Sequence, residues 1–159
     1  MKTLALLLTL VAVGCGTRED DVRRIVREEM ASAMTRKVVS PVETIGPYSP
    51  AIRLGGFLFL SGQIGLDPAS GQLKNESIEV ETRQVLDNVN RILQAEGYDS
   101  SDVVSATVYL KNMNDYAKMN LIYGGYFQEG DYPARTTVAV TELPRSANIE
   151  IAVVAYKTN

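Results

Sequence analysis

The chain of 159 residues contains no histidine, and its single cysteine is Cys15. The absence of histidine excludes histidine general bases, serine–histidine triads and most zinc or iron sites. One cysteine excludes an intrachain disulfide and a thiolate metal cluster. Chemistry in this chain therefore depends on carboxylates, arginine, tyrosine, hydroxyl groups and the backbone, and we expect no metal and no other cofactor.

The chain also lacks an excess of positive charge. It has 16 Lys and Arg against 19 Asp and Glu, which gives a formal net charge of −3, and the sequence contains no basic run. This argues against nucleic acid as a partner, because such binding depends on clustered basic residues. Apolar residues make up 45% of the chain, which is enough for the core of one domain.

No apolar run reaches the roughly 20 residues that span a bilayer. The N-terminus has one positive charge, then an apolar run, then small residues before Cys15, which is typical of an export signal. Residues 12–15, Ala-Val-Gly-Cys, resemble a bacterial lipobox, with Ala12 where Leu is more usual. We therefore expect a signal peptide at 1–14, cleavage before Cys15, and a lipid anchor on that thiol. An uncleaved hydrophobic N-terminus of a cytoplasmic protein is the alternative.

The expected location is the bacterial cell envelope, with membrane attachment through the lipid. Gly16 is not the aspartate that retains lipoproteins in the inner membrane, which favours the periplasmic face of the outer membrane. Residues 15–37 form a charged tether, in which apolar residues at helical spacing predict an amphipathic helix. We expect this helix to lie loosely on the domain. Association of three such helices beneath a trimer is disfavoured, because Glu29 falls near any heptad seam.

Residues 38–159 are expected to form one α+β domain with the element order β-β-β-α-β-α-β-β. Helices are predicted at 77–96, where an apolar stripe ends at Gly97, and from Asn114 or Asp115 to about 127. In the second helix, Tyr116 and Tyr123 are expected to point inward with other apolar residues. Strands are predicted at 38–40, 51–55, 57–63 and 103–110, followed by two more on either side of the loop at 142–148.

Apart from Arg135 and Glu150, the last two strands are apolar or hydroxyl-bearing on both faces. Two helices can cover only one face of such a sheet, so we expect another copy of the chain on the other face. If these strands formed a simple hairpin, Arg135 would lie about 17 Å from Glu150 along the strands, too far for an ion pair. Either the two strands do not pair, or the site residues come together from different strands and chains.

Several motifs in order resemble the RidA/YjgF/UK114 family of enamine and imine deaminases: Gly46-Pro-Tyr-Ser49, Ser61-Gly-Gln63, Pro133-Ala-Arg135 and Ile149-Glu-Ile151. The resemblance covers residues 38 to 157. It implies a chorismate-mutase-like fold, a mixed sheet with two helices on one face, and a homotrimer with clefts between subunits. It also implies deamination of small carboxylated imines, as by a 2-iminobutanoate/2-iminopropanoate deaminase, without a cofactor.

The resemblance and the side-chain chemistry together give roles to six residues. Arg135 would bind the substrate carboxylate in two parallel hydrogen bonds, and Glu150 would orient water and protonate the leaving nitrogen. By resemblance, the substrate-binding residues are Arg135, Tyr48 on a flexible loop, Ser61, Gly62, and Thr137, which stands where many relatives have Cys.

Each of these residues also has an ordinary structural explanation. The alternative for Arg135 is an ion pair in an interface, for Glu150 an edge charge that blocks aggregation, and for Tyr48 packing. Two other functions stay open. One is a non-catalytic ligand-binding or chaperone-like envelope lipoprotein, which the export signal favours because the usual sources of 2-aminoacrylate lie inside the cell. The other is RNA cleavage, which the acidic balance and the missing histidine disfavour.

Overall fold

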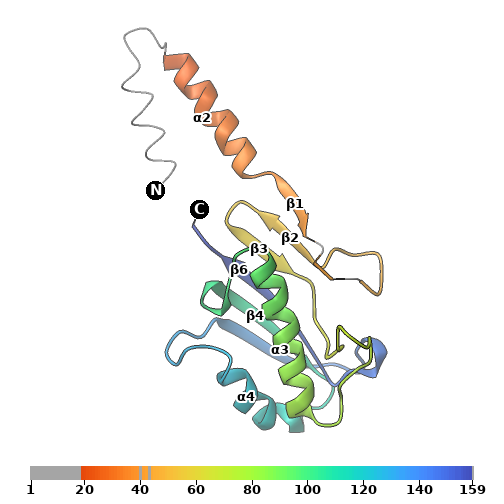
Figure 1. The fold of residues 1–159 in the computed structure, drawn as a ribbon. Coiled ribbons are helices and arrows are strands. Elements are labelled where there is room, and N and C mark those ends of the chain that lie inside the picture. Colours follow the sequence, from red (N-terminus) through yellow and green to blue (C-terminus); the bar gives the residue numbers. More distant parts are fainter. Residues whose placement is uncertain (1–18, 40, 43, 159) are drawn as a thin grey trace.

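The computed structural model describes residues 19–39, 41–42 and 44–158. These residues form a mixed α+β fold with a six-stranded sheet and three α-helices (Figure 1). The helices are α2 (Glu19–Ala33), α3 (Ile78–Ala95) and α4 (Tyr116–Gly124). The strands are β1 (Arg36–Val39), β2 (Ala51–Leu54), β3 (Phe57–Leu60), β4 (Val103–Leu110), β5 (Ala134–Ala139) and β6 (Ile149–Tyr156).

The hairpin signal at Gly55-Gly56 gives the expected β2–β3 hairpin. The two strands pair antiparallel, and Gly55 has a φ of 58°, a left-handed conformation that glycine adopts without strain. β1 adds to the outer side of β2. The predicted element order is confirmed throughout the domain, and β4 has the predicted bounds.

The first helix of the domain follows the sequence signals closely. The side chain of Ser77 caps α3 by accepting a hydrogen bond from the Val80 N–H, and Gly97, with a φ of 79°, follows its end. The second helix differs from the prediction. Asp115 makes no side-chain cap bond, the α-helix ends at Gly124, and Tyr116 is exposed rather than inward.

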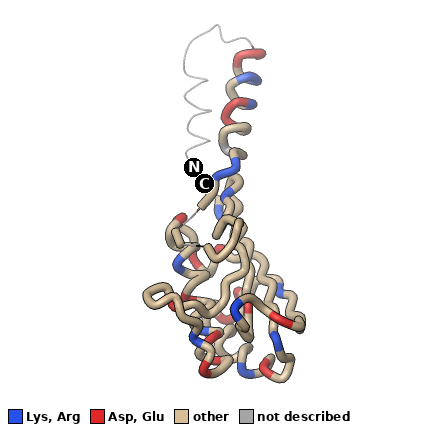
Figure 2. The backbone as a smooth tube through the Cα atoms, turned by 90° about the vertical axis from the view of Figure 1, so that its right-hand side faces the viewer, with Lys and Arg blue, Asp and Glu red and all other residues tan. Residues whose placement is uncertain are grey.

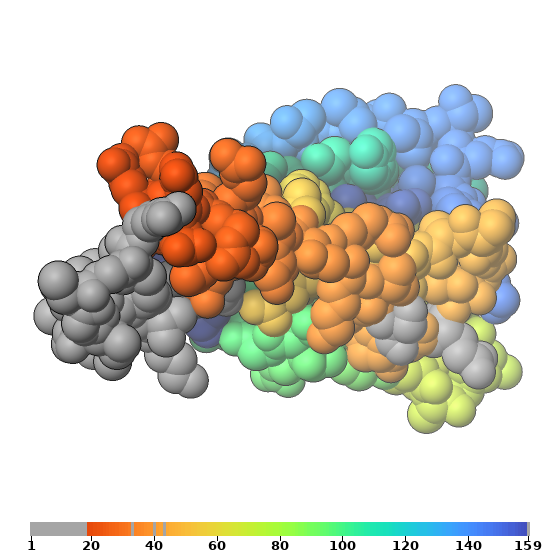
Figure 3. Space-filling model, turned by 90° about the horizontal axis from the view of Figure 1, so that it is seen from above, coloured from red at the N-terminus to blue at the C-terminus, as the bar shows by residue number. Residues whose placement is uncertain are grey.

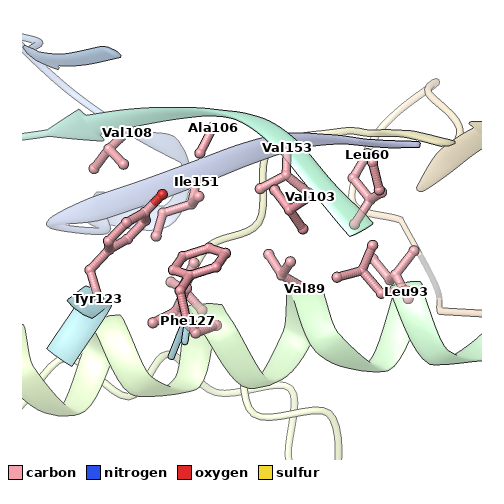
Figure 4. Packing of buried hydrophobic residues seen from close by; sticks show 14 of the residues in the cluster. Leu60, Val89, Leu93, Val103, Ala106, Val108, Tyr123, Phe127, Ile151 and Val153 are labelled. Carbon is pink, nitrogen blue, oxygen red and sulfur yellow. The ribbon is translucent and has the colours of Figure 1, made fainter. Parts of the chain in front are cut away.

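The core lies between this sheet and the helices α3 and α4. Figure 4 shows Val89 and Leu93 of α3 beneath Val103 and Val153, while α4 and the turn after it contribute Tyr123 and Phe127. The inward residues of β6 are fully or almost fully buried: Ile149, Ile151, Val153 and Ala155. The apolar stripe of α3 therefore covers the centre of the sheet, as the sequence predicts.

The last two strands do not form a hairpin. The order of the sheet is β1-β2-β3-β6-β4-β5, so β4 lies between β5 and β6, and it pairs with β5 in parallel and with β6 antiparallel. Of the two possibilities left open by the sequence, the strands not pairing with one another is the one observed. β5 is one of the two edge strands of this sheet, which puts Arg135 at its margin.

The second face of the sheet carries no helix in the described part of the chain. Its large apolar side chains are well exposed, and rings of Phe57 and Tyr156 pack together with their centroids 4.7 Å apart. The exposed apolar residues of β1, β3, β4, β5 and β6 are Val38, Phe57, Phe59, Val104, Val138 and Tyr156. Such a surface agrees with the expectation that another chain covers this face.

The tether contains the predicted amphipathic helix, α2, with Val22, Val26 and Met30 exposed along one side. It does not lie on the domain as expected: it projects beyond β1 (Figure 1), and in the view from above its red and orange residues gather toward one end of the molecule (Figure 3). Among the described residues, no helix is long and apolar enough to cross a membrane. The predicted signal peptide and Cys15 lie outside the described residues.

Candidate active site

Four of the predicted site residues line one small cavity. Tyr48, Ser61, Gly62 and Glu150 border a space of about 240 Å³ between the loop at 44–50, the end of β3 and the start of β6. The remaining lining residues are Ile45, Ile64 and Pro144. The side chains of the cavity wall are therefore apolar except for the Glu150 carboxylate and the hydroxyl groups of Ser61 and Tyr48.

The carboxylate of Glu150 lies directly against Gly62. A Cβ atom at Gly62 would collide with Oε1 of Glu150 and would lie 2.6 Å from its Cδ. Glycine is thus required at this position for the carboxylate to enter the cavity. Burial in these surroundings raises the pKa of Glu150, because the charged form loses hydration without gaining a cation.

Ser61 holds the loop that forms the cavity wall. Its hydroxyl donates to the Ser49 carbonyl at 2.8 Å, and its N–H donates to the Pro50 carbonyl at 3.0 Å. Its proton is therefore already engaged within the chain, and its oxygen keeps acceptor capacity for a ligand. Tyr48, on the same loop, is 45% exposed beside the cavity.

Arg135 belongs to a different cluster, together with α4. Its guanidinium lies 4.5 Å from the ring centre of Tyr123 and donates to the hydroxyl of Tyr116 at 3.2 Å. A hydrogen bond from Asn120 and the nearby charge of Arg135 lower the pKa of Tyr116. Burial raises the pKa of Tyr123 to about 12, so that ring stays neutral beneath the cation.

Several polar atoms beside Arg135 are buried without a hydrogen-bond partner among the described residues. They are Thr137 Oγ1, Asn120 Oδ1 and the Tyr123 hydroxyl. Unpaired buried polar groups are costly and are found where a ligand or partner completes them. Sequence reasoning missed Tyr116, Asn120 and Tyr123 as site residues. Their spacing of four and three residues puts them on one helix face, and this was the available signal.

Arg135 and Glu150 do not meet within one chain. Arg135 is in register with Ala106 and Val153, on the helix-covered face, whereas Glu150 is in register with Tyr109 on the opposite face. The two Cα positions are three residues along and two strands across from each other, about 14 Å apart by ordinary strand dimensions. One chain thus carries two half-sites: the Glu150 cavity and the Arg135 cluster with Thr137.

The described residues offer little to a metal ion. They contain no group of three or more His, Cys, Asp and Glu side chains placed to hold one. The groups that face a ligand are one guanidinium, one carboxylate, hydroxyls and an amide. Together they suit recognition of a planar carboxylate and transfer of a proton.

Comparisons with known proteins show which family this chain resembles. Residues 38–157 match the family described as Endoribonuclease L-PSP. The chain is 53% identical over 113 residues to a RutC family protein of Pyrococcus horikoshii, covering 71% of this chain and 89% of that protein. It is 44% identical over 129 residues to the 2-iminobutanoate/2-iminopropanoate deaminase of Mus musculus, covering 79% and 95%.

Solved structures show the same fold. The YjgF gene product of E. coli is 36% identical to this chain and superimposes with a TM-score of 0.72, covering 76% of this chain and 98% of that one. The chain therefore belongs to the Endoribonuclease L-PSP family, which includes the RutC and RidA proteins.

Proposed function

We propose that this protein hydrolyses 2-imino acids and their enamine tautomers, such as 2-aminoacrylate, to 2-keto acids and ammonia, at a site shared by two copies of the chain. The observation that carries the proposal is the division into two incomplete half-sites on opposite faces of the sheet. One offers a cation held by α4, and the other a carboxylate in an apolar cavity. Contact between two copies of the chain would bring the Arg135 cluster of one copy to the Glu150 cavity of the other.

The proposed steps use only these groups. Arg135 of one copy binds the substrate carboxylate and fixes the C=N bond against Glu150 of the next copy. Water adds to the carbon of the protonated imine while Glu150 takes one proton from the water, which gives a carbinolamine. The Glu150 carboxyl then returns that proton to the amino nitrogen, and the C–N bond breaks as the hydroxyl oxygen forms the C=O bond and gives its own proton to Glu150, from which the ammonia removes it. The products are the keto acid and ammonia. The raised pKa of Glu150 suits a group that must both accept and donate a proton.

The apolar face of the sheet supports assembly into a closed homotrimer. Phe57, Phe59 and Val138 are each about two-fifths exposed there, with no helix over them in the described part of the chain. Two different half-sites require a heterologous, head-to-tail contact, which closes into a ring. Thr137 beside Arg135 would hydrogen-bond substrate or water in place of the cysteine that many relatives have.

Mixing two inactive variants tests the shared site. Arg135→Ala and Glu150→Ala should each abolish the release of keto acid from imines made by an amino-acid oxidase, while the size of the assembly stays unchanged. Dissociated together in equal amounts and reassembled, they should recover about one quarter of the wild-type rate, because one contact in four then has both residues. No recovery, with normal reassembly of wild-type protein treated in the same way, would contradict the shared site. Full activity in either single variant would contradict the chemistry.

RNA cleavage is the function that the family's description names. The chain has no histidine and a net charge of −3, and Figure 2 shows acidic and basic residues interspersed along α2 and scattered over the domain. Neither property favours RNA. RNA degradation that survives both alanine substitutions would come from a contaminant. Ligand binding without turnover would favour the non-catalytic alternative.

The location is proposed from residues 1–16 alone. We infer that the chain is exported and acylated at Cys15, with the periplasmic face of an outer membrane as its site. Labelled palmitate supplied to expressing cells should enter the protein and its membrane fraction, and Cys15→Ala should remove the label. An unlabelled wild-type chain, with a known lipoprotein labelled in the same cells, would contradict the anchor.

A further inference from the structure

A second, larger cavity adjoins the one that holds Glu150. It has a volume of about 540 Å³ and shares four wall residues with the smaller space, among them Tyr48 and Gly62. A ligand with its reacting carbon at Glu150 therefore has room for a side chain on the far side of Gly62. The volume lies in the range of small-molecule pockets.

The charged residues around this larger cavity are mostly basic. Arg91 from α3 and Arg145 from the turn before β6 both line it, and the acidic residue in its wall is Asp67. The negative charge of Asp67 is already compensated within the chain. Its carboxylate accepts the Ala69 N–H at 2.9 Å and lies 3.3 Å from Lys74, and these contacts lower its pKa. No ion pair to Arg91 or Arg145 is found among the residues that the structure describes.

Arg91 is held in place but incompletely satisfied. Its Nη2 donates to Asn88 Oδ1 at 3.0 Å, and the Asn88 amide is itself fixed by donating to the carbonyls of Ile64 and Leu66. The Nε of Arg91 is buried, with no acceptor in the described part of the chain. Arg91 lines the cavity and has no ion pair among the described residues, so an anion within the cavity would make a charge-assisted bond to its guanidinium.

The second guanidinium comes from a strained turn. Arg145 has a φ of 55° and Ser146 a φ of 60°, both in the left-handed region that non-glycine residues avoid. Arg145 reaches across to the Gly71 carbonyl at 3.4 Å, while its neighbour Pro144 lines the smaller cavity. This one turn therefore borders both spaces and presents a cation to the larger one.

We propose that the larger cavity receives the substrate's side chain and selects 2-imino acids whose side chain ends in a carboxylate. This inference rests on the proposed function, since it takes the reacting carbon to lie at Glu150. The α-carboxylate goes to Arg135 of the neighbouring copy, and the distal carboxylate goes to Arg91 and Arg145. A neutral side chain of the same length leaves the two cations without a counter-ion.

The test compares two imines of similar length, 2-iminoglutarate and 2-iminopentanoate, made in place by oxidases from glutamate and norvaline. The wild-type protein should show a kcat/KM at least about tenfold higher for 2-iminoglutarate. Arg91→Gln should reduce this ratio at least about fivefold, mainly through KM, and Arg145→Gln should reduce it less because Arg145 is more exposed. Arg83→Gln, an exposed arginine on the same helix, should leave the ratio and both rates unchanged.

The outcomes separate the two proposals. Hydrolysis of 2-iminopentanoate with no advantage for 2-iminoglutarate would overturn the selectivity and leave the deaminase function standing. An advantage that both Arg91→Gln and Arg145→Gln retain would also overturn it, because the cations would then not carry the preference. Hydrolysis of neither imine would refute the proposed function itself. If Arg91→Gln does not fold, Arg145→Gln alone decides, since that residue lies on the surface.

Discussion

The carboxylate of Glu150 occupies the space that a side chain would fill at Gly62. Gly62→Ala should therefore push the carboxylate out of the small cavity, because the added carbon would lie 2.6 Å from Glu150 Cδ. The expected result is a fall in kcat of about a hundredfold or more for imine hydrolysis, since a displacement of about 1 Å at a reacting group has effects of that size. Steady-state kinetics with the oxidase-coupled assay would measure it.

Gly124→Ala provides the matched control for this substitution. Nothing lies within 4 Å of a Cβ at Gly124, which is the last residue of α4 and has no positive φ. The change should leave activity intact and be neutral or slightly stabilising. Equal kinetics for both alanine variants would show that the contact between Gly62 and Glu150 has no part in the reaction.

Burial of Glu150 predicts a pH dependence of stability. Its pKa in the folded chain is raised above 4.5, the ordinary value that the unfolded chain has. Below that pH the carboxyl is neutral in both states. Between pH 4.5 and the higher folded pKa, Glu150 is ionised in the unfolded chain but still protonated in the folded chain. The folded state therefore loses stability as the pH rises through this window, relative to a chain that cannot ionise at position 150.

Comparison with Glu150→Gln isolates this effect. The free energy of unfolding of the wild type minus that of the variant should fall as the pH rises above 4.5 and become constant above the folded pKa. Urea titrations at one fixed protein concentration would measure it, because the stability of an assembled protein depends on concentration. A difference that rises with pH would mean that Glu150 has a cationic partner in the assembly.

The hydroxyl of Tyr116 predicts a positioning role. It accepts a hydrogen bond of 3.2 Å from Arg135, whose guanidinium also lies over the Tyr123 ring. Tyr116→Phe removes the acceptor and keeps the ring, so the guanidinium should lose part of its fixed orientation. We expect KM for the imine to rise about threefold to tenfold with little change in kcat, because the lost bond is exposed.

Tyr132→Phe is the matched control, because Tyr132 is exposed and lies three residues before Arg135. It should leave KM unchanged. A fall in kcat at constant KM in Tyr116→Phe would contradict the positioning role, since it would mean that the hydroxyl acts on the reacting atoms instead.

Local signals in the sequence were enough to predict most elements of the fold. Ser77 marks the start of α3 and Gly97 its end, because a capping side chain and a left-handed glycine affect only the few residues next to them. Gly55-Gly56 determines a tight hairpin in the same local way. The strand order was not predictable by such signals. That β4 inserts between β5 and β6 depends on contacts between residues 29 to 52 positions apart, which no local pattern records.

The candidate site was predictable only residue by residue. Motif resemblance identified Arg135, Glu150, Gly62 and Thr137, but their arrangement as two half-sites follows from the faces of strands whose order was unknown. Tyr116 was expected to be inward because its aromatic ring fits the apolar pattern of α4. It is exposed because the helix starts at the edge strand, where its ring meets the Arg135 guanidinium rather than the core.

Glu81 gives a prediction about the folding of the Glu150 half-site. This carboxylate on α3 is fully buried, and it accepts hydrogen bonds from both the backbone N–H of Asn148 and its side-chain amide, at 2.9 and 2.8 Å. It thereby attaches α3 to the residue that precedes β6, two positions before Glu150. Glu81→Ala would leave two half-buried donors of Asn148 without their acceptor and a cavity in place of the Glu81 side chain, and should lower the free energy of unfolding by about 2–4 kcal/mol.

Glu76→Ala removes a carboxylate of the same kind from an exposed position just before α3, and it should change stability by less than about 0.5 kcal/mol. Urea denaturation followed by circular dichroism at one protein concentration would measure both variants. Because the start of β6 loses its attachment, kcat for imine hydrolysis should also fall in Glu81→Ala and not in Glu76→Ala. A loss of stability below about 1 kcal/mol in Glu81→Ala would mean that water or a neighbouring chain replaces the carboxylate, because a donor inside the fold that has lost its acceptor costs on the order of 1–3 kcal/mol.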